Sequence, residues 1–139
     1  MKKIKVSEVI DSSHSLMNDI VVGTANNLRD AEFIIKIDDL IKERGITQKD
    51  LAMMTGMRIG TISELVNGKG ISFNKIQLLS LMVALRVTSF SDIFEIRLPE
   101  QQHSEYEQQS TEWKADKEIP IPVKEMFRDN VLKANKLLK

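Results

Sequence analysis

Residues 46–67 read ITQKDLAMMTGMRIGTISELVN, and this stretch decides the fold. Thr47 is suited to begin a helix, because its hydroxyl can accept a backbone N–H that has no partner inside the helix. We expect the helix over residues 48–55. Gly56 then supplies a sharp turn, since a residue without a Cβ adopts positive φ at no steric cost. The expected buried side chains of this helix are Leu51, Ala52 and Met54.

A second helix is expected over residues 58–67. Ile62, Leu65 and Val66 recur at spacings of three and four residues, so they share one face of this helix, and Gly68 ends it. The small side chain of Ala52 lets the two helices approach closely. Two short helices at a steep angle around a glycine turn form a helix-turn-helix, whose second helix can enter the major groove of DNA.

Two stretches of this region, TQKDLAMMTGM and TISELVNGK, resemble the phage-repressor and Cro type of bacterial helix-turn-helix regulators. The resemblance continues through ISFNKIQLLSLMVALRVTSFSDIFEI, which is similar to the fourth and fifth helices of that family, and it covers residues 32–98. It implies a five-helix DNA-binding domain. Ser72 and Ser89 (or Thr88) are suitable caps for its last two helices.

The chain is therefore expected to be all-α, with a repressor-like core and extensions at both ends. Its length of 139 residues is close to that of one domain. The expected parts are an N-terminal extension (1–29), the helix-turn-helix DNA-binding domain (30–98), a polar linker (99–122) and a C-terminal amphipathic helix (123–139). The first helix of the domain is expected over residues 30–44, and its apolar face comprises Phe33, Ile34, Ile37, Leu40 and Ile41.

The extensions leave alternatives open. Ile4 and Val6 alternate with lysines, which fits a short edge strand or a frayed end, and residues 15–22 fit a helix with one apolar side. The Gln/Glu-rich stretch after Pro99 fits a solvated linker or a loose helix. The apolar stripe of the last helix packs either on its own domain or on a second subunit, and a long linker favours the second. The expected dimerisation residues are Val123, Met126, Phe127, Val131, Leu137 and Leu138.

The resemblance also implies which residues contact DNA. Gln48 matches a phosphate-binding position at a helix N-terminus, and residues 58–61 and 64 match positions that face the groove. Ile59 suits a thymine methyl group and Glu64 suits cytosine N4. The alternatives are that Ile59 is a stray apolar surface residue and that Glu64 pairs with a cation one turn away. The lysines suit phosphates, with solvated charge as the alternative. The candidate DNA-binding residues are Gln48, Lys49, Arg58, Ile59, Gly60, Thr61, Glu64, Asn67, Lys69 and Lys75.

One departure from the family concerns the core. Many relatives pair an arginine near the end of the first helix with a glutamate near the end of the recognition helix, whereas Ile41 and Val66 stand at these positions here. Replacing both members of a buried ion pair by packed apolar residues is often neutral or stabilising. We therefore expect Ile41 and Val66 to be buried together.

Charge and composition limit the function classes. Lysine plus arginine and aspartate plus glutamate number 20 each, and the net charge is zero. Residues 33–98 hold nine basic and seven acidic side chains, so this segment has little surplus charge for phosphates, and we expect a homodimer if DNA is the target. Asp38, Asp39 and Asp92 are expected away from the DNA face.

Other functions find little support in the sequence. No cysteine is present, and the chain has neither a secretory signal nor an apolar run of the ~20 residues that cross a bilayer. A cytoplasmic protein without membrane contact is expected. His14 and His103 lack partners at metal-ligand spacing, and no phosphate loop or nucleophile–base pair is recognisable. We therefore expect no enzyme, no metal and no cofactor.

These features predict a regulator, most simply a repressor, that binds a short operator on double-stranded DNA as a dimer. The alternative is a protein-interaction module, such as an antitoxin or a phage-type inhibitor, that uses the same scaffold or the C-terminal helix on a protein partner. The zero net charge and the unusual residues Ile59 and Gly60 favour the alternative, and the intact motif favours DNA.

Overall fold

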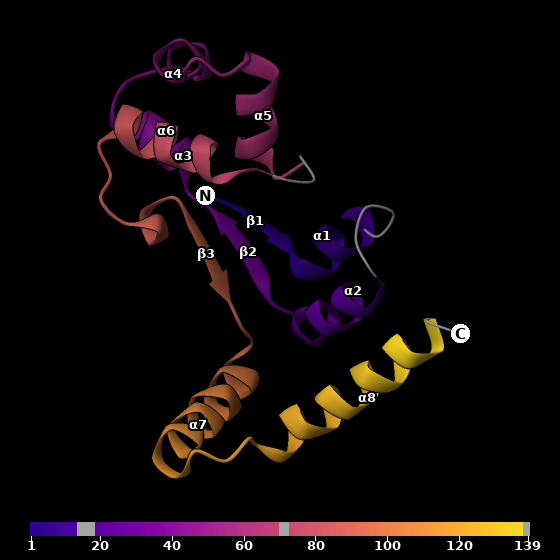
Figure 1. Ribbon diagram of the computed structural model, residues 1–139. Coiled ribbons are helices and arrows are strands. Elements are labelled where there is room, and N and C mark those ends of the chain that lie inside the picture. The colour runs from indigo at the N-terminus through magenta and orange to yellow at the C-terminus, as the bar shows by residue number, and fades with distance from the viewer. Residues whose placement is uncertain (14–18, 70–72, 138–139) are drawn as a thin grey trace.

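The computed structural model describes residues 1–13, 19–69 and 73–137. A small antiparallel sheet lies at the centre, with strand order β1-β2-β3. Figure 1 shows one group of helices at one end of the sheet and α7 and α8 extending from the other end. The strands are β1 (Lys2–Lys5), β2 (Glu32–Ile35) and β3 (Phe94–Arg97). The helices are α1 (Val6–Ser13), α2 (Asp19–Ala25), α3 (Ile37–Glu43), α4 (Gln48–Thr55), α5 (Ile59–Asn67), α6 (Lys75–Leu85), α7 (Glu100–Asp116) and α8 (Ile121–Leu137), with 3-10 turns η2 (Asn26–Leu28) and η3 (Phe90–Asp92).

The prediction of one helix over residues 30–44 is wrong. Residues 32–35 form the central strand β2, and α3 begins only at Ile37. Ile34 and Ile35 are both fully buried although their side chains point to opposite faces of the sheet. A strand that is buried on both faces has a continuous apolar run, and such a run cannot be distinguished from the face of a helix by its spacing.

The prediction of a fifth helix is also wrong. Residues 90–92 form a single 3-10 turn, and the chain then pairs with β2 as strand β3. Phe94 is the reason, since its ring stacks on Phe73 at 4.8 Å between centroids and meets Phe33 and Phe90 at 5.6 Å each. The fold is mostly helical, and the small sheet makes the all-α description only approximate.

The helix-turn-helix follows the sequence closely. Thr47 caps α4, with its hydroxyl accepting from the backbone of Asp50 at 3.1 Å, and the Asp50 carboxylate accepts from the Thr47 N–H at 3.0 Å. Leu51 and Ala52 are buried as predicted, but Met54 is exposed, because the short α4 buries only a narrow strip between α5 and α6.

The N-terminal cap of α6 lies two residues later than predicted. Asn74 accepts from the backbone of Gln77 at 2.8 Å, and the Gln77 side chain accepts in return from Asn74 N–H at 3.1 Å. Ser72 lies outside the described residues. Ser89 does precede η3, but its side chain makes no capping hydrogen bond.

The N-terminal segment is part of the fold. β1 is an edge strand that pairs with β2, with Ile4 opposite Phe33. Ile10 of α1 and Ala31 are buried. Of the helix predicted over residues 15–22, residues 15–18 lie outside the described part, and α2 runs from Asp19 through Gly23 to Ala25.

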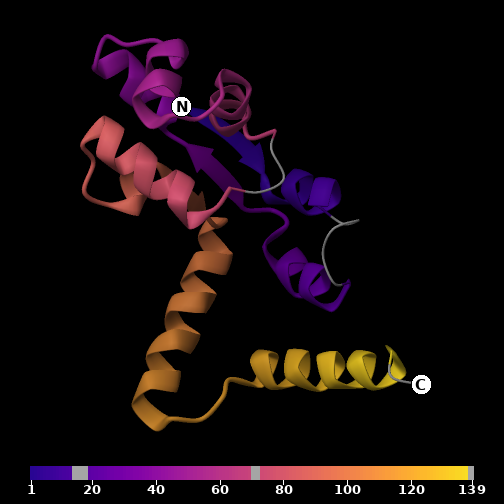
Figure 2. The same ribbon diagram turned by 45° about the horizontal axis from the view of Figure 1, so that its top comes forward.

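The C-terminal segment is helical almost throughout. The stretch expected as a polar linker contains α7, which resolves the two alternatives in favour of a helix, and α8 begins at Ile121. α7 has no buried residue, and pairs one turn apart support it: Gln101 donates to Glu105 and Gln108 donates to Glu112, each at 3.2 Å. Figure 2 shows α7 leading away from the sheet and α8 turning at its end. Among the described helices, none is both long enough and apolar enough for a membrane crossing.

Candidate nucleic-acid interface

The turn between α4 and α5 is held by hydrogen bonds of Thr55. Its hydroxyl donates to the carbonyl oxygen of Leu51 at 2.8 Å and accepts from the backbone N–H of Met57 at 3.2 Å. Gly56 has a φ of 83°, and its N–H donates to Ala52 O at 2.8 Å. The glycine was predicted from the sequence, whereas the role of Thr55 was not, because threonine is compatible with a helix interior.

Helix α5 divides into a buried face and an open face. Ile62, Leu65 and Val66 are buried in the core, as predicted. Arg58, at the N-cap, is exposed. Of the candidate DNA-binding residues, Gln48, Thr61 and Asn67 are half-buried, and those that are exposed are Lys49, Arg58, Ile59, Gly60, Glu64, Lys69 and Lys75.

The open face of α5 carries no side chain at Gly60. A Cβ built on this residue would meet no atom within 4 Å, so packing inside the protein does not require glycine there. Ile59 next to it is 55% exposed. The backbone of α5 can therefore come close to a partner surface at this point.

Two polar side chains of α5, Glu64 and Asn67, differ in whether they bind partners inside the protein. Within the described parts of the chain, no cation lies within ion-pair distance of Glu64, so the nearby-cation alternative is not realised there. The Asn67 amide donates to Ser63 O at 2.9 Å and to Ser63 Oγ at 3.4 Å, which engages it inside the helix.

Four cations among the candidate DNA-binding residues have no ion pair within the described residues. No carboxylate of the described segments lies within salt-bridge distance of Lys49, Arg58, Lys69 or Lys75. Their charge remains available to an anionic partner such as a phosphate backbone.

Acids of α3 are instead paired with other cations. Asp38 accepts from Lys42 Nζ at 2.9 Å, and this hydrogen bond together with the charge of Asp38 raises the pKa of Lys42. Asp39 accepts from the N-terminal ammonium at 3.0 Å and shares a depression with Asp92, Lys36 and Arg86. These acids therefore do not oppose the cations of the helix-turn-helix.

The core fixes α5 relative to α3 and the sheet. Ile41 and Val66 are both buried in one apolar cluster, as the paired loss of the ion pair predicts. At the end of α5, Gly68 has a φ of 69°, and a Cβ there would lie 2.9 Å from the Cδ1 atoms of Ile35 and Ile4. The sequence indicated the helix end at Gly68 but not this contact with the sheet.

The exposed apolar surface of α6 was not predicted from the sequence. Helix α6 leaves Ile76, Leu79 and Val83 mostly in solvent, and Met53 of α4 is 76% exposed. The signal is present in the sequence, because KIQLLSLMVAL has more apolar positions than one helix face can bury.

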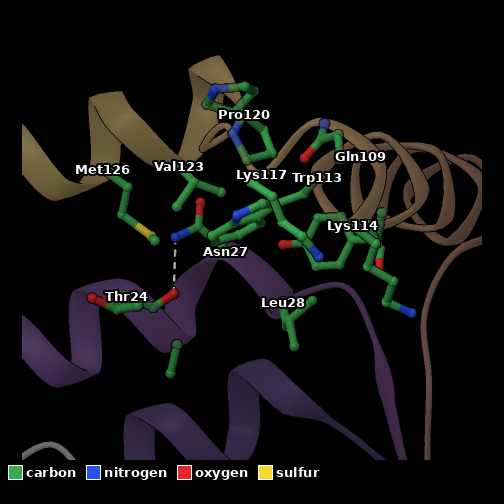
Figure 3. A pocket seen from close by; sticks show the side chains of 14 residues that line it. Thr24, Asn27, Leu28, Gln109, Trp113, Lys114, Lys117, Pro120, Val123 and Met126 are labelled. Atoms are coloured by element: carbon green, nitrogen blue, oxygen red, sulfur yellow. Dashed lines mark hydrogen bonds between the residues drawn. The ribbon is translucent and has the colours of Figure 1, made fainter.

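The expected dimerisation stripe of α8 is split between two faces. Val123 and Met126 are half-buried and point toward α2 and η2 (Figure 3). Phe127 and Val131 are exposed. The side chains of Leu137 and Leu138 lie outside the described part of the structure. The structure thus places Val123 and Met126 within its own subunit and leaves Phe127 and Val131 open.

The fold and the open face of α5 define a helix-turn-helix protein. Residues 36–97 match the family described as the Cro/C1-type HTH DNA-binding domain. This match over residues 36–97 confirms the resemblance noted in the sequence. No curated protein and no solved structure matches the chain. In the described residues, no group of three or more His, Cys, Asp or Glu side chains is arranged to hold a metal ion.

Proposed function

We propose that this protein is a cytoplasmic transcription repressor that binds a short operator as a homodimer. The observation that carries the proposal is the open face of α5, where Arg58, Ile59, Gly60 and Glu64 are exposed and where, within the described residues, neither Arg58 nor Glu64 has an ion-pair partner. A second helix with one buried face and one open face is the element that enters the major groove in this class of motif.

The proposed contacts fall into two groups. Arg58 and Thr61 read base edges, Ile59 contacts a thymine methyl group, and Glu64 accepts from cytosine N4, with Gly60 allowing close approach. The contacts to backbone phosphates, which set the register, come from Gln48, Lys49, Asn67, Lys69 and Lys75.

Dimerisation is proposed through α8, with the exposed Phe127 and Val131 at the interface and Leu137 and Leu138 as further interface residues. The exposed rings and branched side chains there are costly to leave in water. A second subunit also doubles the number of phosphate contacts, which compensates for the small charge surplus of one domain.

A second candidate function is the capture of a protein by the same face. Met53, Met54 and Ile59 expose large apolar side chains on or beside the helix-turn-helix. Flexible methionines are common on surfaces that bind protein partners. An antitoxin or inhibitor would use these residues in place of base contacts.

A gel shift with DNA from upstream of the protein's own gene, at two salt concentrations, tests the proposal. The expected result is a discrete complex that a scrambled fragment of equal length does not form and that weakens as salt rises. Equal affinity for both fragments at both salt concentrations would exclude the operator proposal and favour the protein-binding candidate.

A further inference from the structure

A cavity of about 800 Å³ lies at the junction of α7 and α8 with the N-terminal helices. Figure 3 shows its three walls: Thr24, Asn27 and Leu28 on one side, Trp113 of α7 on the second, and Val123 and Met126 of α8 on the third. A volume of this size is in the range of pockets that hold small organic molecules. The cavity is distant in the chain from the open face of α5 and takes no part in the proposed DNA contacts.

Hydrogen bonds between distant segments hold the walls in place. Gln102 of α7 donates to Asn27 O at 2.7 Å, and Asn130 of α8 donates to Thr24 Oγ1 at 3.0 Å. Asn27 itself donates to Thr24 O at 2.8 Å, which Figure 3 marks with a dashed line. These bonds satisfy polar groups beside the cavity, so the space between them is mainly apolar.

Aromatic side chains of α7 form one wall. Tyr106 and Trp113 are seven residues apart, two turns of helix, and therefore lie on one face. Both rings are incompletely covered, with Tyr106 43% and Trp113 39% exposed. The pairing of such rings with the flexible Met126 across the cavity suits a flat apolar group.

The charged groups that line the cavity are cations. Lys114 and Lys117 belong to the lining, which contains no acidic residue. Neither lysine has a carboxylate within salt-bridge distance in the part of the chain that is described. The nearest acids in sequence are Glu112, Asp116 and Glu118, and none of them lines the cavity. Glu112 accepts from Gln108, and the Asp116 carboxylate accepts from the Glu118 N–H at 2.8 Å.

We propose that this cavity binds a small aromatic anion, with the ring between Trp113 and Met126 and the carboxylate, sulfonate or phosphate group at Lys114 and Lys117. Apolar walls supply the affinity for the ring, and the cations of the lining select the charge. Because the ligand would touch α2, α7 and α8 together, it would favour the arrangement of these helices seen here.

A matched pair of dyes tests the proposal on the full chain. Anilinonaphthalene sulfonate is an aromatic anion, and phenylnaphthylamine has the same ring system without the charge. Trp113 is the only tryptophan in the sequence and lines the cavity, so energy transfer from its fluorescence reports a dye bound in this region, and the lysine variants below locate it. We expect the anionic dye to accept energy from Trp113 and to bind about tenfold more tightly than the neutral dye, since two surface ion pairs each contribute about threefold.

Lysine variants locate the charge. Lys114→Gln with Lys117→Gln is expected to weaken the anionic dye about tenfold and to leave the neutral dye unchanged. Lys124→Gln is the matched control, because Lys124 lies on α8 beside exposed Phe127 and Val131 but does not line the cavity. Far-ultraviolet circular dichroism verifies that each variant is folded.

Two outcomes would overturn the proposal. Equal affinity for the two dyes would mean that any apolar surface suffices, including one that a second subunit covers. Loss of anionic dye binding in Lys124→Gln but not in the double variant would assign the dye to the outward face of α8. Both outcomes are independent of DNA binding, since none of the variants lies in α4 or α5.

Discussion

Gly68 and Ile35 are in such close contact that a Cβ on the glycine would lie 2.9 Å from the Cδ1 atom of the isoleucine. Gly68 ends α5, the second helix of the helix-turn-helix, and Ile35 lies on the central strand β2. The sheet therefore sets the position at which α5 is held.

This contact predicts that Gly68→Ala is more destabilising than Gly56→Ala. Both glycines have positive φ, but a Cβ on Gly56 would meet no atom within 4 Å. Gly56→Ala thus reports backbone strain alone, about 1 kcal/mol, whereas Gly68→Ala adds a collision with packed side chains of a further ~1–2 kcal/mol. Urea unfolding of both variants measures the difference. Equal losses in the free energy of unfolding would show that the side chains of the sheet move away from the added Cβ at no cost.

Features that depend on residues close together in the sequence could be predicted. The Thr47 cap, the Gly56 turn and the burial of Ile62 and Leu65 depend on residues within a few positions of one another, and all were predicted. Strand β2 was not, because its partner Ile96 lies far along the chain from Phe33. Apolar spacing over residues 30–44 fits a helix as well as a strand that is covered on both faces.

The same contrast applies to the candidate site. The open face of α5 follows from the spacing of its buried residues, and these were visible in the sequence. The cavity at α7 was not, because Trp113 and Thr24 meet only through the path of α7 and α8. Polar α7 also lacks an apolar stripe that would have revealed a packed face.

If α5 reads the operator, three alanine variants separate base contacts from phosphate contacts. Arg58→Ala and Thr61→Ala should each weaken the binding free energy for the operator by about 1–3 kcal/mol. Their effect on the binding of scrambled DNA should be small. Lys69→Ala should weaken both DNAs alike and lower the salt dependence. Fluorescence anisotropy with labelled duplexes measures all three. Negligible effects of every variant on the operator would contradict the assignment of this face.

The packing of Ile41 and Val66 predicts an asymmetry between a single and a double variant. Both are buried in one apolar cluster, so Ile41→Arg places a charge without a partner in the core. It should lower the free energy of unfolding by about 3–5 kcal/mol. Adding Val66→Glu should recover much of this loss, because it supplies the missing carboxylate. Thermal melts of the two variants measure it. A double variant no more stable than the single one would show that the two side chains do not meet.

The last prediction concerns which of two exposed apolar surfaces, on α8 or on α6, joins the subunits of the proposed dimer. Phe127 and Val131 lie open on α8, and Leu79 lies open on α6. Fully burying a large apolar side chain is worth about 1.5–3 kcal/mol, so a surface used by a dimer should be sensitive to a single charge. We expect Phe127→Lys, and likewise truncation after Glu118, to shift the protein toward monomer while the sheet and α3–α6 stay folded.

Leu79→Lys is the matched control, since it introduces the same charge at an equally exposed residue on the other surface. Sedimentation velocity at several concentrations measures the mass of each variant. Operator affinity of the α8 variants should fall along with the mass, because a monomer loses half of the phosphate contacts. A monomer produced by Leu79→Lys and not by Phe127→Lys would move the interface to α6. α8 would then serve mainly as a wall of the cavity beside Trp113 and Thr24.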